Sequence, residues 1–311
     1  MTKAVINDQP TGMFTGITLI FYLLIGCDNK INSGKSDLPE YDLENPEITL
    51  ILPDTLREIS GLTIINDKTI ACVQDENGIL FIYNISRNKI QDQYTFNIDG
   101  DYEGITRVDN TIYILQSDGV LYEISNYDKK EFKINSYPIP TPSDNNEGLC
   151  YDQKNDRLLI ASKTKPGKGP ENKNRREIYS FDLKTKKLSE EPIYNFDVET
   201  IIQFALDNNL DLPEKTRKKG NDKVNIPVMK LFTSAIAIQP VTHDLYLLSA
   251  ADHMLFIFGP EGSIKHAEML DETTFNKAEG ISFFDNGDML ITNEAQDKHA
   301  TLMRFNYRQQ K

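Results

Sequence analysis

The feature that most constrains the fold of this chain is a repeat of about 44 residues. Five apolar, strand-like segments begin with a small residue beside a polar or acidic one: EISGL, YEGI, NEGL, SAIAI and AEGI. Their small residues align as Gly61, Gly104, Gly148, Ala235 and Gly280, with steps of 43, 44, 87 and 45 residues. A period of this length that is built from short strands is typical of a β-propeller, in which each repeat forms one blade.

The second repeat shows what one blade contains. Four strand-like segments follow one another, GITRV, TIYILQ, VLYEIS and EFKINSYPI, with Asp-Asn and Ser-Asp-Gly turns between the first three. The 87-residue step holds one blade and additional chain, and VETIIQFALDNN within it has apolar residues at helical spacing. We therefore predict an all-β fold, a five-bladed β-propeller over residues 47–311, with a short helical insertion at about 197–230 in the third blade.

The two ends of the predicted propeller are complementary. The fifth repeat contains only three strands, the last of them TLMRFNY, whereas EITLILP at residues 47–53 precedes the first repeat. If this N-terminal strand completes the last blade, it closes the ring and protects an open sheet edge.

The first 46 residues are of a different kind. The apolar segment from Phe14 to Gly26 is too short to span a bilayer and has the length of a signal-peptide core. It leads into LIGC, ending at Cys27, which resembles a bacterial lipobox, in which the cysteine thiol is lipidated. The alternative is a short buried helix that ends in cysteine. We expect residues 1–27 to be a lipoprotein signal peptide and residues 28–46 a polar tether, which anchors the protein to a membrane of the bacterial cell envelope.

Composition restricts the partners. The formal net charge of −13 argues against a nucleic-acid or general anionic-membrane binder and suits cations. Cys72 and Cys150 lie in apolar runs of different repeats, so we expect them to be buried and unpaired. The four histidines, at positions 243, 253, 266 and 299, lack metal-ligand spacing.

Three glutamates hold one register in the repeat. The positions before the aligned small residues are Ser60, Glu103, Glu147, Ser234 and Glu279. The first strand of each blade lines the central channel of a propeller, so these positions form a ring. Close carboxylates repel one another unless a cation lies among them, and calcium accepts six to eight oxygen ligands.

We therefore predict a calcium site formed by Glu103, Glu147 and Glu279, with Glu58 as a weaker candidate on the same strand. The alternative is that these glutamates cap loop amides or pair with basic residues near the channel mouth.

The repeats also resemble a known family. The five motifs, each followed by a D/N-G or N-D turn and a third strand rich in Tyr or Phe, resemble the SdiA-regulated propellers, distant relatives of the NHL-repeat proteins. The resemblance covers about residues 47–307. It implies a five-bladed propeller, a calcium site and often a signal or membrane anchor, and it implies no physiological activity.

Two classes of function remain open on the sequence alone. The first is a calcium-binding envelope propeller that binds an envelope protein, a glycan or a phosphorylated ligand; the basic stretches at 163–176 and 215–223 suit the last of these, although solvated loops are the alternative. The second is a calcium-dependent hydrolase, a phosphoesterase or a lactonase or esterase, acting at the channel mouth. The sequence has no Gly-x-Ser-x-Gly, His-Glu-x-x-His or phosphate-binding glycine loop, so it leaves catalytic residues unassigned.

Overall fold

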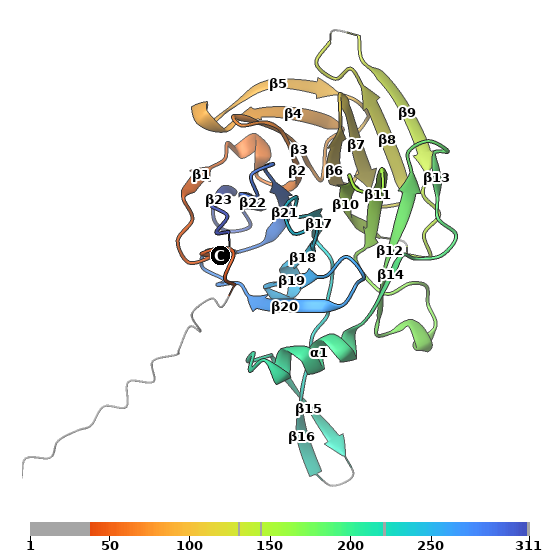
Figure 1. Ribbon diagram of the computed structural model, residues 1–311, viewed down its shortest axis with the longest axis vertical. Coiled ribbons are helices and arrows are strands. Elements are labelled where there is room, and N and C mark those ends of the chain that lie inside the picture. Colours follow the sequence, from red (N-terminus) through yellow and green to blue (C-terminus); the bar gives the residue numbers. More distant parts are fainter. Residues whose placement is uncertain (1–37, 130, 144, 220–221, 310–311) are drawn as a thin grey trace, which may run out of the picture. The chain divides into compact units, whose positions relative to one another are not determined.

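The computed structural model describes residues 38 to 309, apart from residues 130, 144, 220 and 221. Residues 36–311 belong to one compact unit. Five antiparallel sheets surround a central axis in this unit (Figure 1), so the predicted five-bladed, all-β propeller is confirmed.

Each of the first two blades is a four-stranded meander, as the repeat predicts. Blade 1 contains β2 (Ile59–Asn66), β3 (Thr69–Gln74), β4 (Ile79–Asn84) and β5 (Lys89–Thr95). Blade 2 contains β6 (Tyr102–Val108), β7 (Thr111–Gln116), β8 (Val120–Ser125) and β9 (Lys133–Pro138).

The other three blades vary this plan at their outer edges. Blade 3 contains β10 (Asn146–Asp152), β11 (Arg157–Ser162), β12 (Arg175–Asp182) and two short strands that both pair with β12, β13 (Lys187–Leu188) and β14 (Tyr194–Asp197). Blade 4 contains β17 (Ala235–Ile238), β18 (Leu245–Ser249), β19 (Met254–Phe258) and β20 (Ile264–Met269). Blade 5 contains β21 (Ala278–Phe283), β22 (Met289–Asn293) and β23 (Thr301–Phe305), and its outer strand is β1 (Ile48–Ile51). Short 3₁₀ turns lie at η1 (Asp54–Leu56), η2 (Ile85–Arg87), η3 (Pro170–Asn172) and η4 (Ala250–Asp252).

The ring closes through its two ends. Strand β1 pairs antiparallel with β23, with Ile48 opposite Arg304 and Ile51 opposite Thr301. This confirms the prediction that the segment at 47–53 supplies the missing outer strand. The edge of blade 5 is therefore covered by chain from the other end of the domain.

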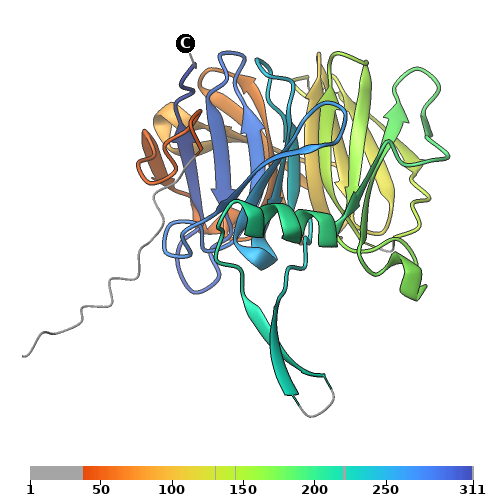
Figure 2. The same cartoon turned by 60° about the horizontal axis from the view of Figure 1, so that its bottom comes forward.

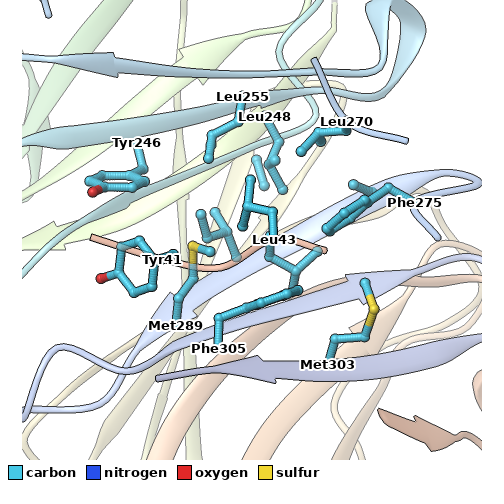
Figure 3. Close-up of a cluster of buried hydrophobic side chains, with 14 of the residues drawn as sticks. Tyr41, Leu43, Tyr246, Leu248, Leu255, Leu270, Phe275, Met289, Met303 and Phe305 are labelled. Atoms are coloured by element: carbon cyan, nitrogen blue, oxygen red, sulfur yellow. The ribbon is translucent and has the colours of Figure 1, made fainter. Parts of the chain in front are cut away.

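The segment before β1 is part of the fold, so the expected polar tether at 28–46 does not extend over residues 38 to 46. Leu38, Tyr41 and Leu43 are buried in the cluster between blades 4 and 5. Figure 3 shows Tyr41 and Leu43 among side chains of both blades. The Tyr41 hydroxyl donates to the Gly287 carbonyl at 2.6 Å. Residues 1–37, which include the signal-peptide and Cys27 predictions, lie outside the described residues.

Side chains between neighbouring sheets form the core. The buried apolar residues fall into five clusters, each between two adjacent blades. Cys72 and Cys150 belong to two of these clusters and are buried free thiols, as expected. Because every blade is covered on both faces, its central strands read as nearly continuous apolar runs.

The insertion follows blade 3. The predicted short helix is α1 (Val198–Asp207), whose first turn is capped by the Asp197 side chain and which buries Val198, Ile201 and Ala205. It leads into a two-stranded hairpin that the sequence analysis did not predict, β15 (Glu214–Lys219) with β16 (Asp222–Pro227). Figure 2 shows this hairpin projecting away from the ring. Within the described part of the chain, no helix is long and apolar enough to cross a membrane.

Candidate functional site

The inner strands β2, β6, β10, β17 and β21 build the candidate site. Glu103, Glu147 and Glu279 line one small cavity of about 10 Å³ at the axis. We call these three residues, with the buried Ser60 and Ser234 of the same register, the acidic mouth. The structure thus brings together the three glutamates that the repeat singled out.

An aliphatic ring lies next to the acidic mouth. Two residues further along each inner strand stand five side chains that are at most 5% exposed: Leu62, Ile105, Leu149, Ile236 and Ile281. They line the same small cavity as the glutamates. Since all five line this cavity at the axis, the aliphatic ring lies directly beside the carboxylates.

Each glutamate sits at a break in the strand pairing. The register shifts between Tyr102 and Gly104, between Asn146 and Gly148, and between Ala278 and Gly280, and in each case the skipped residue is the glutamate. Such bulges leave one residue unpaired and redirect its side chain. The repeated bulge is the local reason that three carboxylates point toward one axis.

The glycine after each bulge allows the inner strands to approach closely. A Cβ atom at Gly104 would lie 2.5 Å from the Leu149 Cβ and 3.0 Å from the Glu147 carbonyl oxygen. One at Gly61 would lie 2.7 Å from the Glu103 carbonyl oxygen. These glycines are therefore structural, and their role is to let neighbouring strands meet at the axis.

Two lysines neutralise two of the glutamates. Lys163 Nζ lies 2.6 Å from Glu147 Oε1, and Lys277 Nζ lies 3.2 Å from Glu279 Oε1. Lys277 also forms an ion pair with Glu294. Among the described residues Glu103 has no salt bridge, so it is the uncompensated member of the acidic mouth.

Burial controls the protonation of these groups. Burial, then repulsion from Glu147, Asp101 and Glu279, raises the pKa of Glu103 to about 9. Burial also raises the pKa of Glu147 to about 7, although Lys163 opposes the shift. The pKa of Glu279 is raised by burial against the influence of Lys277. At neutral pH Glu103 therefore holds a proton.

The weaker candidate, Glu58, does not line the small cavity. It stands near Asp75, whose pKa is raised to about 6 by burial first and by Glu58 and Glu294 next. The Asp75 Oδ1 atom is buried and has no hydrogen-bond partner, and the same holds for Asn293 Oδ1 and Thr292 Oγ1. Additional unsatisfied oxygens thus lie at the junction of blades 5 and 1.

The chemistry of the acidic mouth fits a hard cation, but its geometry is that of a lysine-paired cluster. Carboxylate oxygens are the ligands that calcium prefers. In the described residues no group of three or more His, Cys, Asp or Glu side chains is arranged to hold a metal ion. An incoming ion would have to replace Lys163 or Lys277, whose side chains are 35% and 33% exposed. Calcium therefore stays a prediction, and the alternative pairing with basic residues is present in the structure.

Sequence reasoning did not single out these two lysines. Lys163 was grouped with the basic stretch at 163–176, although it directly follows β11 at the same end of the sheet as Glu147. Lys277 stands two residues before Glu279, on the same side of an extended chain. The two-residue spacing of Lys277 and Glu279 in the motif KAEG indicates this ion pair from the sequence.

A second cavity opens beside the acidic mouth. It measures about 490 Å³, and its walls include Lys163, Lys277, Glu279 and His253. Of the four histidines, His253 lines this cavity and His299 does not. Glu279 borders both cavities, so a bound molecule could reach the carboxylates from this side.

Comparisons with known proteins support the fold and assign no family. No family model matches the sequence, and no curated protein matches it. Among solved structures, Myxococcus xanthus glutaminyl cyclase is 11% identical, with a TM-score of 0.53 and coverage of 85% of this chain and 97% of that one. A streptogramin B lyase is 14% identical, with a TM-score of 0.46 and coverage of 84% and 97%. At such identities the likeness concerns the β-propeller architecture alone.

Proposed function

We propose that this protein is a binding propeller that takes a cation, calcium by our prediction, at the acidic mouth. The observation that carries the proposal is Glu103, a carboxyl group near the axis without a salt bridge among the described residues, beside two further glutamates. A cation among these carboxylates would favour their ionised forms and displace the proton that Glu103 holds. The resemblance of the repeats to the SdiA-regulated propellers supports the same proposal.

Calcium would compete with the protein's own ammonium groups. Lys163 and Lys277 are both partly exposed, and flexible lysine side chains can extend into solvent when their partners are taken. Glu103, Glu147 and Glu279 would then supply the oxygen ligands, and Glu58 and Asp75 would lie at the periphery.

The predicted anchor completes the proposal. Lipidation of Cys27 would hold the propeller at a membrane of the cell envelope, where it would present the ion to an envelope protein, a glycan or a phosphorylated ligand. Replacing Cys27 with Ser should release the protein from the detergent phase. If wild-type protein partitions into the aqueous phase as well, the anchor is wrong.

Calcium titration by calorimetry tests the cation site. Wild-type protein stripped with a chelator should bind calcium, and Glu103→Gln should weaken binding about tenfold or more because it removes a ligand charge while keeping the shape. The matched control is Glu190→Gln, an exposed acid on the outer side of blade 3. Lys277→Met should strengthen binding, because it removes a competing cation. Equal affinity in Glu103→Gln and wild type would contradict the proposal.

A catalytic function is the second candidate, and the 490 Å³ cavity favours it. Glu279 and Lys277 border this cavity together with His253, and burial raises the pKa of the Glu279 carboxyl, which suits a group that donates a proton to a leaving group. A panel of phosphoesters, lactones and aryl esters, assayed with and without calcium, separates the two functions. Turnover that Glu279→Gln abolishes would establish the hydrolase, and an inactive panel would favour the binding module.

A further inference from the structure

The opposite end of the channel holds a large cavity. It measures about 1130 Å³ and lies where the five inner strands end and turn outward. All five blades contribute to its walls. We call this cavity the funnel. Its volume lies slightly above the usual range of pockets that bind drug-sized ligands.

The floor of the funnel is a third ring of the repeat. Four residues beyond the register of the acidic mouth, each inner strand carries a partly exposed side chain: Ile64, Arg107, Tyr151, Ile238 and Phe283. Four of these five are apolar or aromatic, which makes the floor suited to an apolar body. The aliphatic ring lies between this floor and the glutamates, so the funnel and the acidic mouth are separate sites.

Arg107 is the exceptional member of the floor. Its Nη1 and Nε atoms donate to backbone carbonyls, at 2.8 Å to Ile65 and 2.6 Å to Asp109. These bonds fix the guanidinium group across blades 1 and 2. Among the described residues Arg107 has no carboxylate partner, and its Nη2 group makes no hydrogen bond within the chain. A positive charge with free donors therefore stands in an otherwise apolar ring.

Two further arginines line the funnel, and both are already neutralised. Arg157 pairs with Asp152 at 2.8 Å, and Arg304 pairs with Asp288 at 2.5 Å. Each uses only part of its donor set in these bonds. The rim of the funnel also carries three exposed acids, Asp67, Asp109 and Asp285. Solvent screens these carboxylates more strongly than it screens the charge of Arg107 on the floor.

We propose that the funnel binds an amphipathic monoanion, a molecule with an aromatic or apolar body and one carboxylate, sulfonate or similar group. The anion would accept hydrogen bonds from the free guanidinium donors of Arg107. The body would cover Ile64, Ile238, Phe283 and Tyr151, whose exposed apolar surface is otherwise in contact with water. This site does not depend on calcium or on the proposed function of the acidic mouth.

Two fluorescent dyes test the site in the native protein. The first, 8-anilinonaphthalene-1-sulfonate, combines an aromatic body with one sulfonate, and the second, N-phenyl-1-naphthylamine, has the same body without the charge. The native protein should bind the sulfonate dye more tightly. Arg107→Gln should weaken that dye about tenfold, as expected for one charge-assisted hydrogen bond, and should change the uncharged dye less than about twofold.

Variants keep the test specific. Arg87→Gln, an exposed arginine at the outer edge of blade 1, should leave both dyes unchanged, and Phe283→Ala should weaken both. If Arg107→Gln does not fold, Arg107→Lys replaces it and should retain the preference for the charged dye. Equal binding of the two dyes, no binding of the sulfonate dye, or loss of its binding in Glu103→Gln would overturn the proposal.

Discussion

At the residue scale, the acidic mouth is defined by an imbalance of charge. Lys163 and Lys277 each pair with one glutamate of the mouth, whereas Glu103 relies on a proton. Repulsion and burial both disfavour its ionised form. The register of the repeat was enough to predict which glutamates meet, but the lysines that pair with them come from a loop and a strand start. Contacts between side chains of different blades depend on tertiary packing. A local sequence pattern therefore does not predict them.

The proton on Glu103 makes stability depend on pH. Its pKa is about 9 in the folded protein and near the usual 4.5 when unfolded, so the unfolded chain releases a proton that the folded protein holds. The contribution of protonated Glu103 to the free energy of unfolding is therefore fully present below about pH 4.5 and is lost as pH rises toward about 9. In chelator, the melting temperature of wild type should fall relative to Glu103→Gln across this range. If the melting temperatures of the two proteins change with pH in the same way from about pH 5 to 9, Glu103 is ionised in the folded protein and this prediction is wrong.

At the element scale, the sequence predicted the strands better than the segment that leads into them. Alternating apolar residues and turn residues predicted the inner strands and the closing strand β1, because those patterns are local. Leu38, Tyr41 and Leu43 stand in a stretch rich in acidic residues and proline and show no strand or helix period. Their burial depends on the space between blades 4 and 5, which only the closed ring creates. The hairpin β15–β16 was missed because its strands are highly charged and contribute no buried apolar face.

The segment at 38–46 should therefore contribute to stability. Tyr41→Phe removes the hydroxyl that donates to Gly287 at 2.6 Å and should lower the free energy of unfolding by about 1 kcal/mol. Tyr41→Ala removes a ring that is 1% exposed and should cost about 3–5 kcal/mol, as for other buried aromatic residues. Urea denaturation measures both. If both variants unfold at the wild-type midpoint, these residues act as a tether after all.

At the scale of the whole molecule, the repeat places three kinds of side chain along one axis. Carboxylates stand at one mouth, the aliphatic ring follows, and the mixed floor of the funnel stands at the other end. A five-bladed propeller with this division offers two sites that can be tested separately. The number of blades could be predicted from spacing alone, whereas the cavities depend on the turns between strands, whose shapes the sequence does not fix.

The most direct test of the cation site counts the protons that calcium displaces. Burial raises the pKa of both Glu103 and Glu147, and an ion that binds their carboxylates must expel the protons that these groups hold. Calorimetry in buffers of different ionisation enthalpy should show that calcium binding releases protons at pH 7. The number should fall toward zero well above pH 9, where both groups are already ionised. Calcium binding without proton release at pH 7, or no calcium binding, would contradict the account.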